Sequence, residues 1–219
     1  MRTVICLFSL FALVFHAGLL PAQFSISASS GLNISNQVYS RIPDGADPGS
    51  SSFYQTQPAL FYFFEVRPGL ELAKKWKAGL GIQYSVKGYS RAFINDHTDT
   101  GGKFSFIDIM PVVEYRACKF LAVFGGLNVG LLTRERFKLS DEWIKAIISI
   151  NKRTDLGGLI GLRGNYKGFT LSFHYNRSIL PVLDVIFTGV NGEELGQLKS
   201  FNSNFQVGIG YMIDNVFKK

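Results

Sequence analysis

The chain is poor in cysteine, and after its first segment it lacks any long apolar run. Its 219 residues include two cysteines: Cys6 lies near the N-terminus, and Cys118 stands alone in the remainder. A single thiol cannot form an internal disulfide. Beyond residue 22 no apolar stretch reaches the roughly 20 residues that a membrane-spanning helix needs. These absences argue against a disulfide-stapled domain and against a helical membrane protein.

The N-terminal segment predicts a signal peptide over residues 1–22. Arg2 supplies a positive start, residues 4–20 are apolar with two polar exceptions, and Ala22 is a small residue at the expected cleavage point. A membrane anchor is the alternative, but the apolar run is short for one. We therefore expect residues 23–219 to form one exported domain.

Positive charge exceeds negative charge, with a formal net charge of +7. The basic residues are scattered over turns and loops without forming a stripe, which argues against nucleic acid and favours anionic lipid headgroups as neighbours. No phosphate-binding loop, dinucleotide fingerprint or Cys/His metal spacing occurs. His97 with Asp96 and Asp99 is too weak a cluster to predict a metal site. We expect no cofactor.

Alternation of apolar and polar residues is the dominant pattern of the chain. Residues 77–87 place Ala78, Leu80, Ile82 and Tyr84 on one parity, with polar residues or glycine on the other. Because side chains alternate faces along a strand, one face is apolar and the other polar. The same pattern recurs over residues 24–31, 60–72, 107–116, 121–131, 155–166, 169–176 and 204–211.

The gaps between these eight segments alternate between long and short. Long loops are expected at 36–58, 88–102, 132–154 and 179–200, and short turns at 73–76, 117–119 and 167–168. Short periplasmic turns and long outer loops are typical of outer-membrane barrels. The prediction is an all-β fold, an eight-stranded antiparallel up-and-down transmembrane β-barrel.

A soluble barrel or sandwich also alternates, but three features favour a membrane. The apolar parity carries no charge within any segment, whereas the polar parity carries charges of both signs. Aromatic residues gather at the end with the short turns, as in an aromatic girdle. They are Phe24, Trp76, Tyr115, Tyr166, Phe169 and Tyr211.

The polar parity predicts the contents of the barrel. An eight-stranded barrel is just wide enough for side chains or one small ligand. Ten charged residues of this parity are expected to point inward, five of each sign. Two of them are Lys77 and Asp155, and the other eight belong to the network given below. Balanced charge indicates a plugged lumen, with a small-solute pore as the alternative. The predicted lumen network comprises Glu65, Arg67, Glu71, Gln83, Lys87, Asp108, Glu114, Arg116, Arg163 and His174.

Catalysis has one candidate, because His174 lies two residues from Ser172 on the same face. A nucleophile and its base must lie within hydrogen-bond reach. Both residues are expected to face the lumen and not the lipid. We expect His174 to be a member of the polar plug and the protein not to be an enzyme, with a lipid-modifying activity as the less favoured alternative.

The third long loop could form one short helix. Ser140 would cap it, with acidic residues in its first turn. Trp143, Ile144, Ile147 and Ile148 would then share one face. Such a helix would lie over the barrel mouth or present a docking surface for a partner.

Two prolines, Pro68 and Pro111, fall inside expected strands of the barrel. Proline cannot donate to a ladder, and a closed barrel has no free edge. We expect a bulge or local kink at each.

Four stretches in order resemble the PorT-like outer-membrane β-barrel family: residues 76–88, 106–115, 155–161 and 175–179. They are similar to its Gly-Leu…Tyr-Ser-x-Lys-Gly, Tyr-Leu-Glu-Ile-Pro-Leu-Leu-x-Lys-Tyr, Asp-x-Gly…Gly-x-Gly and Tyr-x-x-Gly-Leu strands. Asp108, Glu114 and Ser178 replace the usual Glu, Lys and Gly, and Met110 is an extra residue before the proline.

The resemblance covers about residues 23–213 and implies an eight-stranded barrel without known catalysis. One family member is linked to type IX secretion and gliding, and only fold and location carry over. The C-terminus departs from the usual terminal aromatic, because Lys218 and Lys219 follow Phe217. We expect a monomer in a Gram-negative outer membrane, surrounded by lipid. Its expected role is structural or binding (envelope integrity, adhesion or a secretion-complex accessory), with a protein partner at the outer loops.

Overall fold

The computed structural model describes residues 24–40, 56–91, 100–139, 142–146, 151–188, 190–192 and 194–214. The expected signal peptide and the His97 cluster lie outside these residues. Within them, no helix has the length and apolarity that crossing a membrane requires. The strands are β1 (Phe24–Ser40), β2 (Ala59–Ala73), β3 (Trp76–Arg91), β4 (Thr100–Arg116), β5 (Leu121–Leu139), β6 (Glu142–Lys145), β7 (Thr154–Tyr166), β8 (Phe169–Ser178), β9 (Leu183–Thr188) and β10 (Glu194–Asp214).

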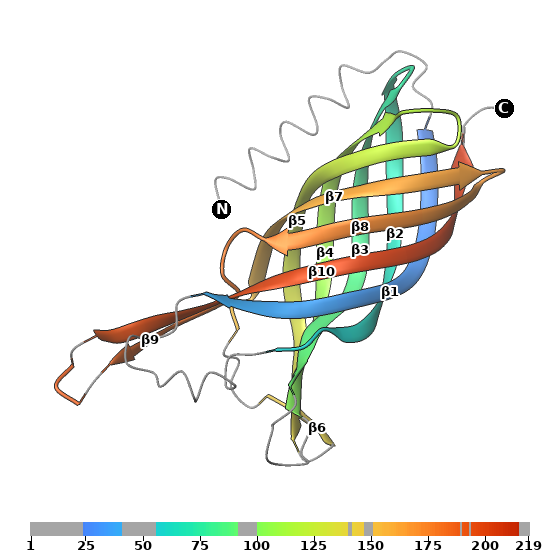
Figure 1. The fold of residues 1–219 in the computed structure, drawn as a ribbon. Helices are drawn as coiled ribbons and strands as arrows, with labels where there is room; N and C mark the ends of the chain where they lie inside the picture. The colour runs from blue at the N-terminus through green and yellow to red at the C-terminus, as the bar shows by residue number, and fades with distance from the viewer. Residues whose placement is uncertain are drawn as a thin grey trace.

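Eight of these strands close into a barrel (Figure 1). β1 to β5, β7, β8 and β10 pair antiparallel with their neighbours in chain order, and β10 returns to β1. The closing ladder runs without a shift from Ser25 opposite Asp214 to Ser40 opposite Lys199. The predicted eight-stranded up-and-down barrel is therefore confirmed. The short strands β6 and β9 extend the sheet beyond the barrel, on β5 and β10.

Alternation places the polar parity inside and the apolar parity outside. On β8 every second residue from Phe169 is exposed and the residues between them are buried. The outward residues of β8 from Phe169 to Tyr175 are large and apolar, and Phe169 and Ile209 expose more than two thirds of their surfaces. In water such a surface would be unfavourable, but in hydrocarbon it is the expected exterior of a barrel.

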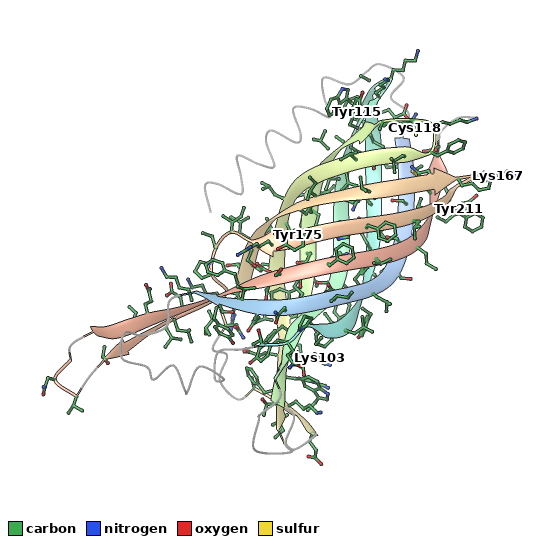
Figure 2. The ribbon with its side chains drawn as sticks, viewed as in Figure 1. Lys103, Tyr115, Cys118, Lys167, Tyr175 and Tyr211 are labelled. Carbon is green, nitrogen blue, oxygen red and sulfur yellow. The ribbon has the colours of Figure 1, made fainter. Side chains whose placement is uncertain are left out.

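Aromatic rings gather at the end with the short turns. Ring centroids lie 4.9 Å apart for Trp76 and Tyr115, and 5.4 Å apart for Phe169 and Tyr211. Tyr115 and Tyr211 lie at this end with the turn residue Lys167, and Lys103 lies at the opposite end (Figure 2). By the usual topology of such barrels, the turn end faces the periplasm and the Lys103 end faces outward.

The predicted bulge is absent at both prolines, and the alternative of a local kink stays a prediction. Pro68 stays in register with β1 and Pro111 with β3. On the other side of each, the ladder skips two pairs and resumes in the same register. Each strand lacks ladder pairs on one side of its proline, because the proline nitrogen has no hydrogen to donate there.

Gly126 permits the close approach of β4 and β5 beside Pro111. A Cβ at Gly126 would lie 2.1 Å from the Pro111 carbonyl oxygen, whereas a Cβ at Gly125 would find its nearest neighbour at 3.5 Å. We expect Gly126→Ala to lower the free energy of unfolding by about 1–3 kcal/mol, because backbone must move. Urea unfolding in lipid vesicles measures the change. Gly125→Ala is the matched control, and equal effects of the two variants would contradict the steric explanation.

The predicted helix in the third outer loop is wrong where the structure describes it. Trp143 and Ile144 lie on β6, which pairs with β5 through Lys138 and Phe137. Ile147 and Ile148 lie outside the described residues. The alternative of continuing the β5 ladder satisfies the backbone groups of this segment and overrides its local helical pattern. Trp143 and Ile144 therefore do not belong to the expected apolar helix face.

Candidate functional site: the barrel interior

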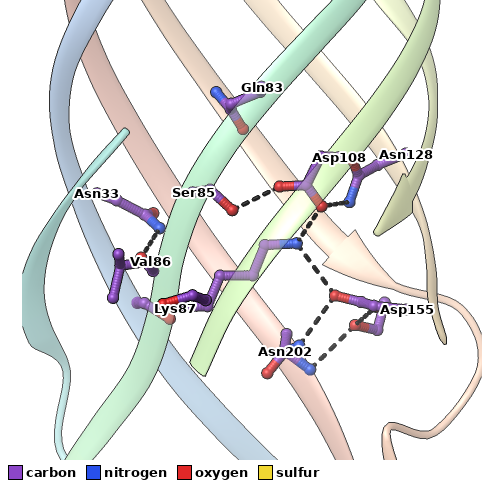
Figure 3. Close-up of polar contacts among 12 residues, drawn as sticks. Asn33, Gln83, Ser85, Val86, Lys87, Asp108, Asn128, Asp155 and Asn202 are labelled. Carbon is purple, nitrogen blue, oxygen red and sulfur yellow. Dashed lines mark hydrogen bonds and ion pairs between the residues drawn. The ribbon is translucent and has the colours of Figure 1, made fainter. Parts of the chain in front are cut away.

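The centre of the outer half of the lumen is occupied by Lys87 of β3 (Figure 3). Its ammonium nitrogen lies 2.9 Å from Asp108 Oδ1 on β4 and 3.2 Å from Asp155 Oδ2 on β7. The side chains of Lys87 and Asp108 have no solvent exposure, and Asp155 has almost none. One cation thus holds two carboxylates from two other strands.

Neutral donors complete the coordination of the two carboxylates. Asn128 donates to Asp108 at 3.2 Å, and Ser85 donates to its other oxygen. Asn202 donates to Asp155 at 2.9 Å, and Ser178 donates to its second oxygen. These hydrogen bonds stabilise the negative charge that one ammonium cannot balance. The cluster connects six of the eight barrel strands, β3, β4, β5, β7, β8 and β10, and we call it the Lys87 cluster.

Gly130 explains how two carboxylates fit around one ammonium. Asp108 and Asp155 both pair across the ladder with Gly130. A Cβ at Gly130 would stand 2.5 Å from Asp108 Oδ1 and 3.4 Å from Asp155 Cβ. The glycine leaves the space into which Lys87 reaches.

A second cluster surrounds the ring of Phe124. The Arg67 and Arg163 guanidinium groups lie over this ring, with their carbons 4.8 and 5.4 Å from its centroid. Arg67 is paired with Glu65, and Arg163 Nη1 lies 3.0 Å from Glu114 Oε2. Both arginines thus combine a buried ion pair with a cation–π contact. We call this group the Phe124 cluster.

Two amides lie between these clusters. Gln83 Nε2 donates to Gln206 Oε1 over 2.8 Å across the lumen. Gln83 is the cross-strand neighbour of both Glu65 and Asp108. The lumen is therefore bridged at the level between its two charged groups.

His174 lies against aromatic rings in the Phe124 cluster. Its ring centroid lies 6.0 Å from that of Phe63 and 5.9 Å from that of Phe124. Ser172 donates to the Gly208 carbonyl oxygen over 3.4 Å. Among the described residues, no hydrogen bond joins the Ser172 hydroxyl to His174. The geometry of a nucleophile with its base is not formed here.

The remaining predicted charges lie toward the periplasmic end. Arg116 Nη2 lies 2.8 Å from Glu71 Oε1, but both side chains are partly exposed. Lys77 is buried, stands opposite Glu71 and Glu114 in the ladders, and donates to the Met212 sulfur at 3.3 Å. Most of the predicted residues thus belong to two buried clusters or to one partly exposed pair, with Gln83 between the clusters and Lys77 buried outside them.

Apolar residues also lie inside the barrel, and the sequence pattern was not used to predict them. Phe63, Phe104, Phe106 and Phe124 share the inward parity and are almost completely buried. Lys87 Nζ lies 4.6 Å from the Phe106 ring centroid. The signal was present, because these phenylalanines stand at polar-parity positions. The predicted lumen network was chosen mainly by charge, so it left them out, together with the inward amides Asn33, Asn128, Asn202 and Gln206.

A closed antiparallel barrel with an apolar exterior and a polar, side-chain-filled interior defines the class of small transmembrane β-barrels. Residues 18–184 match the model of the outer membrane protein beta-barrel domain family. The chain belongs to this family, and it is a protein of the outer membrane.

Solved structures with a similar fold include outer-membrane barrels from several bacteria. Ail of Yersinia pestis is 17% identical, with 89% of this chain and 100% of that chain covered and a TM-score of 0.44. Neisserial surface protein A is 12% identical (86% and 96% covered, TM-score 0.46). OprG of Pseudomonas aeruginosa is 14% identical (88% and 96% covered, TM-score 0.46). No curated protein sequence matches the chain.

Proposed function

We propose that the protein is a non-enzymatic binding or structural component of the outer membrane, whose filled barrel anchors hairpins outside the cell. The observation that carries this proposal is the filled interior. The Lys87 and Phe124 clusters are buried, and within each cluster side chains from several strands bind one another. An interior made of mutually bound side chains supports an anchor more than a channel, whose lining must exchange its contacts with a solute.

The outer hairpin of β9 and β10 supports a binding role because it is held firmly. Lys152 donates its backbone N–H to the Val182 carbonyl oxygen over 2.6 Å, and Val182 donates to Ser200 over 2.8 Å. Near the tip, Ile186 is more than half exposed and Val190 is fully exposed. Apolar side chains presented to water on a fixed hairpin suit a protein partner.

Three narrower statements are part of this proposal. The four motifs described above support a PorT-like relationship within the family. The N-terminal pattern supports export with cleavage after residue 22. The closed barrel, with no unpaired edge among its eight strands, supports a monomer in the membrane. Adhesion, envelope integrity and assistance to a secretion complex are the roles open to such an anchor.

Conductance distinguishes the anchor from a pore. We expect the chain, purified from outer membranes and inserted into a planar lipid bilayer, to give no stable conductance steps. A boiling-dependent shift on a gel shows that the inserted material is folded. Reproducible single-channel steps from folded protein would contradict the proposal and favour the small-solute pore. Lipid turnover that disappears in His174→Ala would instead favour an enzyme.

A further inference from the structure

Basic residues gather on β4, β5 and β6, beyond the outer limit of the lipid-facing apolar band. Leu131 is the last apolar residue in the outward row of β5, and Arg134 and Arg136 follow it. In the ladders Arg136 stands opposite both Lys103 and Lys145. Three cations therefore occupy one row across three strands.

Such a row is unfavourable by itself, because like charges directly opposite on a sheet repel. Among the described residues, no ion pair joins an acidic side chain to Lys103, Arg134, Arg136 or Lys145. The neighbouring acid, Glu135, is buried and accepts a hydrogen bond from Asn151 at 2.6 Å. The repulsion in this row would be relieved by an anion from outside the chain.

A cleft beside β5 gives such an anion a place. The cleft has a volume of about 690 Å³, and its charged lining comprises four cations, Arg134, Arg136, Lys145 and Arg153, and one acid, Glu135. It opens where β6 leaves β5 and before β7 joins it. Hydrogen bonds from Ala146 N–H to the Glu135 carbonyl oxygen, at 3.2 Å, and from Leu132 N–H to the Arg153 carbonyl oxygen, at 2.8 Å, mark its two ends.

The depth of the cleft relative to the membrane identifies the source of the anion. Leu131 pairs with Ile107, and Ile107 pairs with Tyr84, which marks the outer limit of the exposed apolar surface on these strands. Arg134 comes three residues after Leu131, directly above the hydrocarbon. The polar headgroup region begins at this depth.

We propose that Lys103, Arg134, Arg136, Lys145 and Arg153 form a basic face that binds the phosphate groups of glycolipid in the outer leaflet. Arginine guanidinium groups match phosphate oxygens in pairs, and the cleft beside them offers space for a headgroup. The Trp143 ring, 5.9 Å from Lys103 Nζ, lies at the same face. This site is separate from the lumen and does not depend on whether the barrel is an anchor or a pore.

The test is native mass spectrometry of the folded chain in zwitterionic detergent with diphosphoryl lipid A. Each basic residue at an anionic surface contributes about a fivefold change in affinity. We therefore expect Arg134→Gln/Arg136→Gln to bind about 25-fold more weakly. Lys74→Gln/Lys75→Gln removes the same charge from the β2–β3 turn at the opposite end, and it is expected to bind like the parent. Heat-modifiability on a gel verifies folding, and Lys145→Gln/Arg153→Gln replaces the first variant if it fails to fold.

The same experiment with other probes distinguishes the occupants. Lipid A without its phosphates is expected to lose the binding. Inositol hexakisphosphate, a soluble polyanion, is expected to bind more weakly than the lipid, because it lacks the adjoining acyl chains. Equal binding of the two forms of lipid A, unchanged binding by the arginine variant, or tighter binding of the soluble polyanion would each overturn the proposal.

Discussion

Lys87→Met is expected to destabilise the barrel by about 3–5 kcal/mol, the usual cost of leaving buried charge without its partner. Methionine is close to lysine in length and removes only the ammonium that holds Asp108 and Asp155. Both carboxylates would remain buried next to each other with only neutral donors. Urea unfolding in lipid vesicles, followed by the fluorescence of Trp76 and Trp143, measures the loss.

Two further variants show whether the cause is charge. Lys87→Met/Asp108→Asn/Asp155→Asn removes all three charges and is expected to recover most of the lost stability, because no uncompensated ion remains. Lys152→Met breaks an ion pair of 3.3 Å with Asp184 in which both side chains are partly exposed, so its effect should stay below about 1 kcal/mol. If Lys87→Met and Lys152→Met had equal effects, the interior would have to be solvated, and the anchor proposal would lose its support.

The architecture was accessible from the sequence because a barrel repeats one simple rule. Alternation of period two gave the strands, and alternating gap lengths gave the order of loops and turns. The same alternation placed Lys87, Asp108 and Asp155 on the inner face without any knowledge of the fold. Parity is a local property of each strand, so it survives errors in the position of strand ends.

Contacts across the barrel were not accessible, because they depend on register and tilt. Lys87 reaches Asp155 on β7 only because Gly130 leaves space between the two carboxylates. Arg67 and Arg163 both lie over the ring of Phe124, an uncharged residue that a pattern of charges does not include.

The β6 segment was predicted as a helix but forms a strand. Its local pattern favours a helix, but pairing with β5 satisfies more backbone groups than a single helical turn would. The basic face was missed for the same reason, since Lys103, Arg136 and Lys145 become neighbours only through the ladders.

Ile209→Arg is expected to destabilise the protein by about 2–4 kcal/mol in lipid vesicles, because it places a charge within the hydrocarbon. Ile209 is exposed on the outer face of β10, between Phe205 and the girdle residue Tyr211. Most of its side chain is exposed, so an arginine has room there. In a soluble barrel, arginine at so exposed a position would cost little.

Ile213→Arg is the matched control for this prediction. Ile213 has the same side chain on the same strand and the same outward parity, but it lies next to Asp214 at the periplasmic end of β10. There an arginine reaches the headgroups, so the cost should fall to about 0–1 kcal/mol. Urea unfolding of both variants in the same vesicles gives the comparison. Depth is the only large difference between the two sites, so equal costs would mean that hydrocarbon does not surround β10 at Ile209.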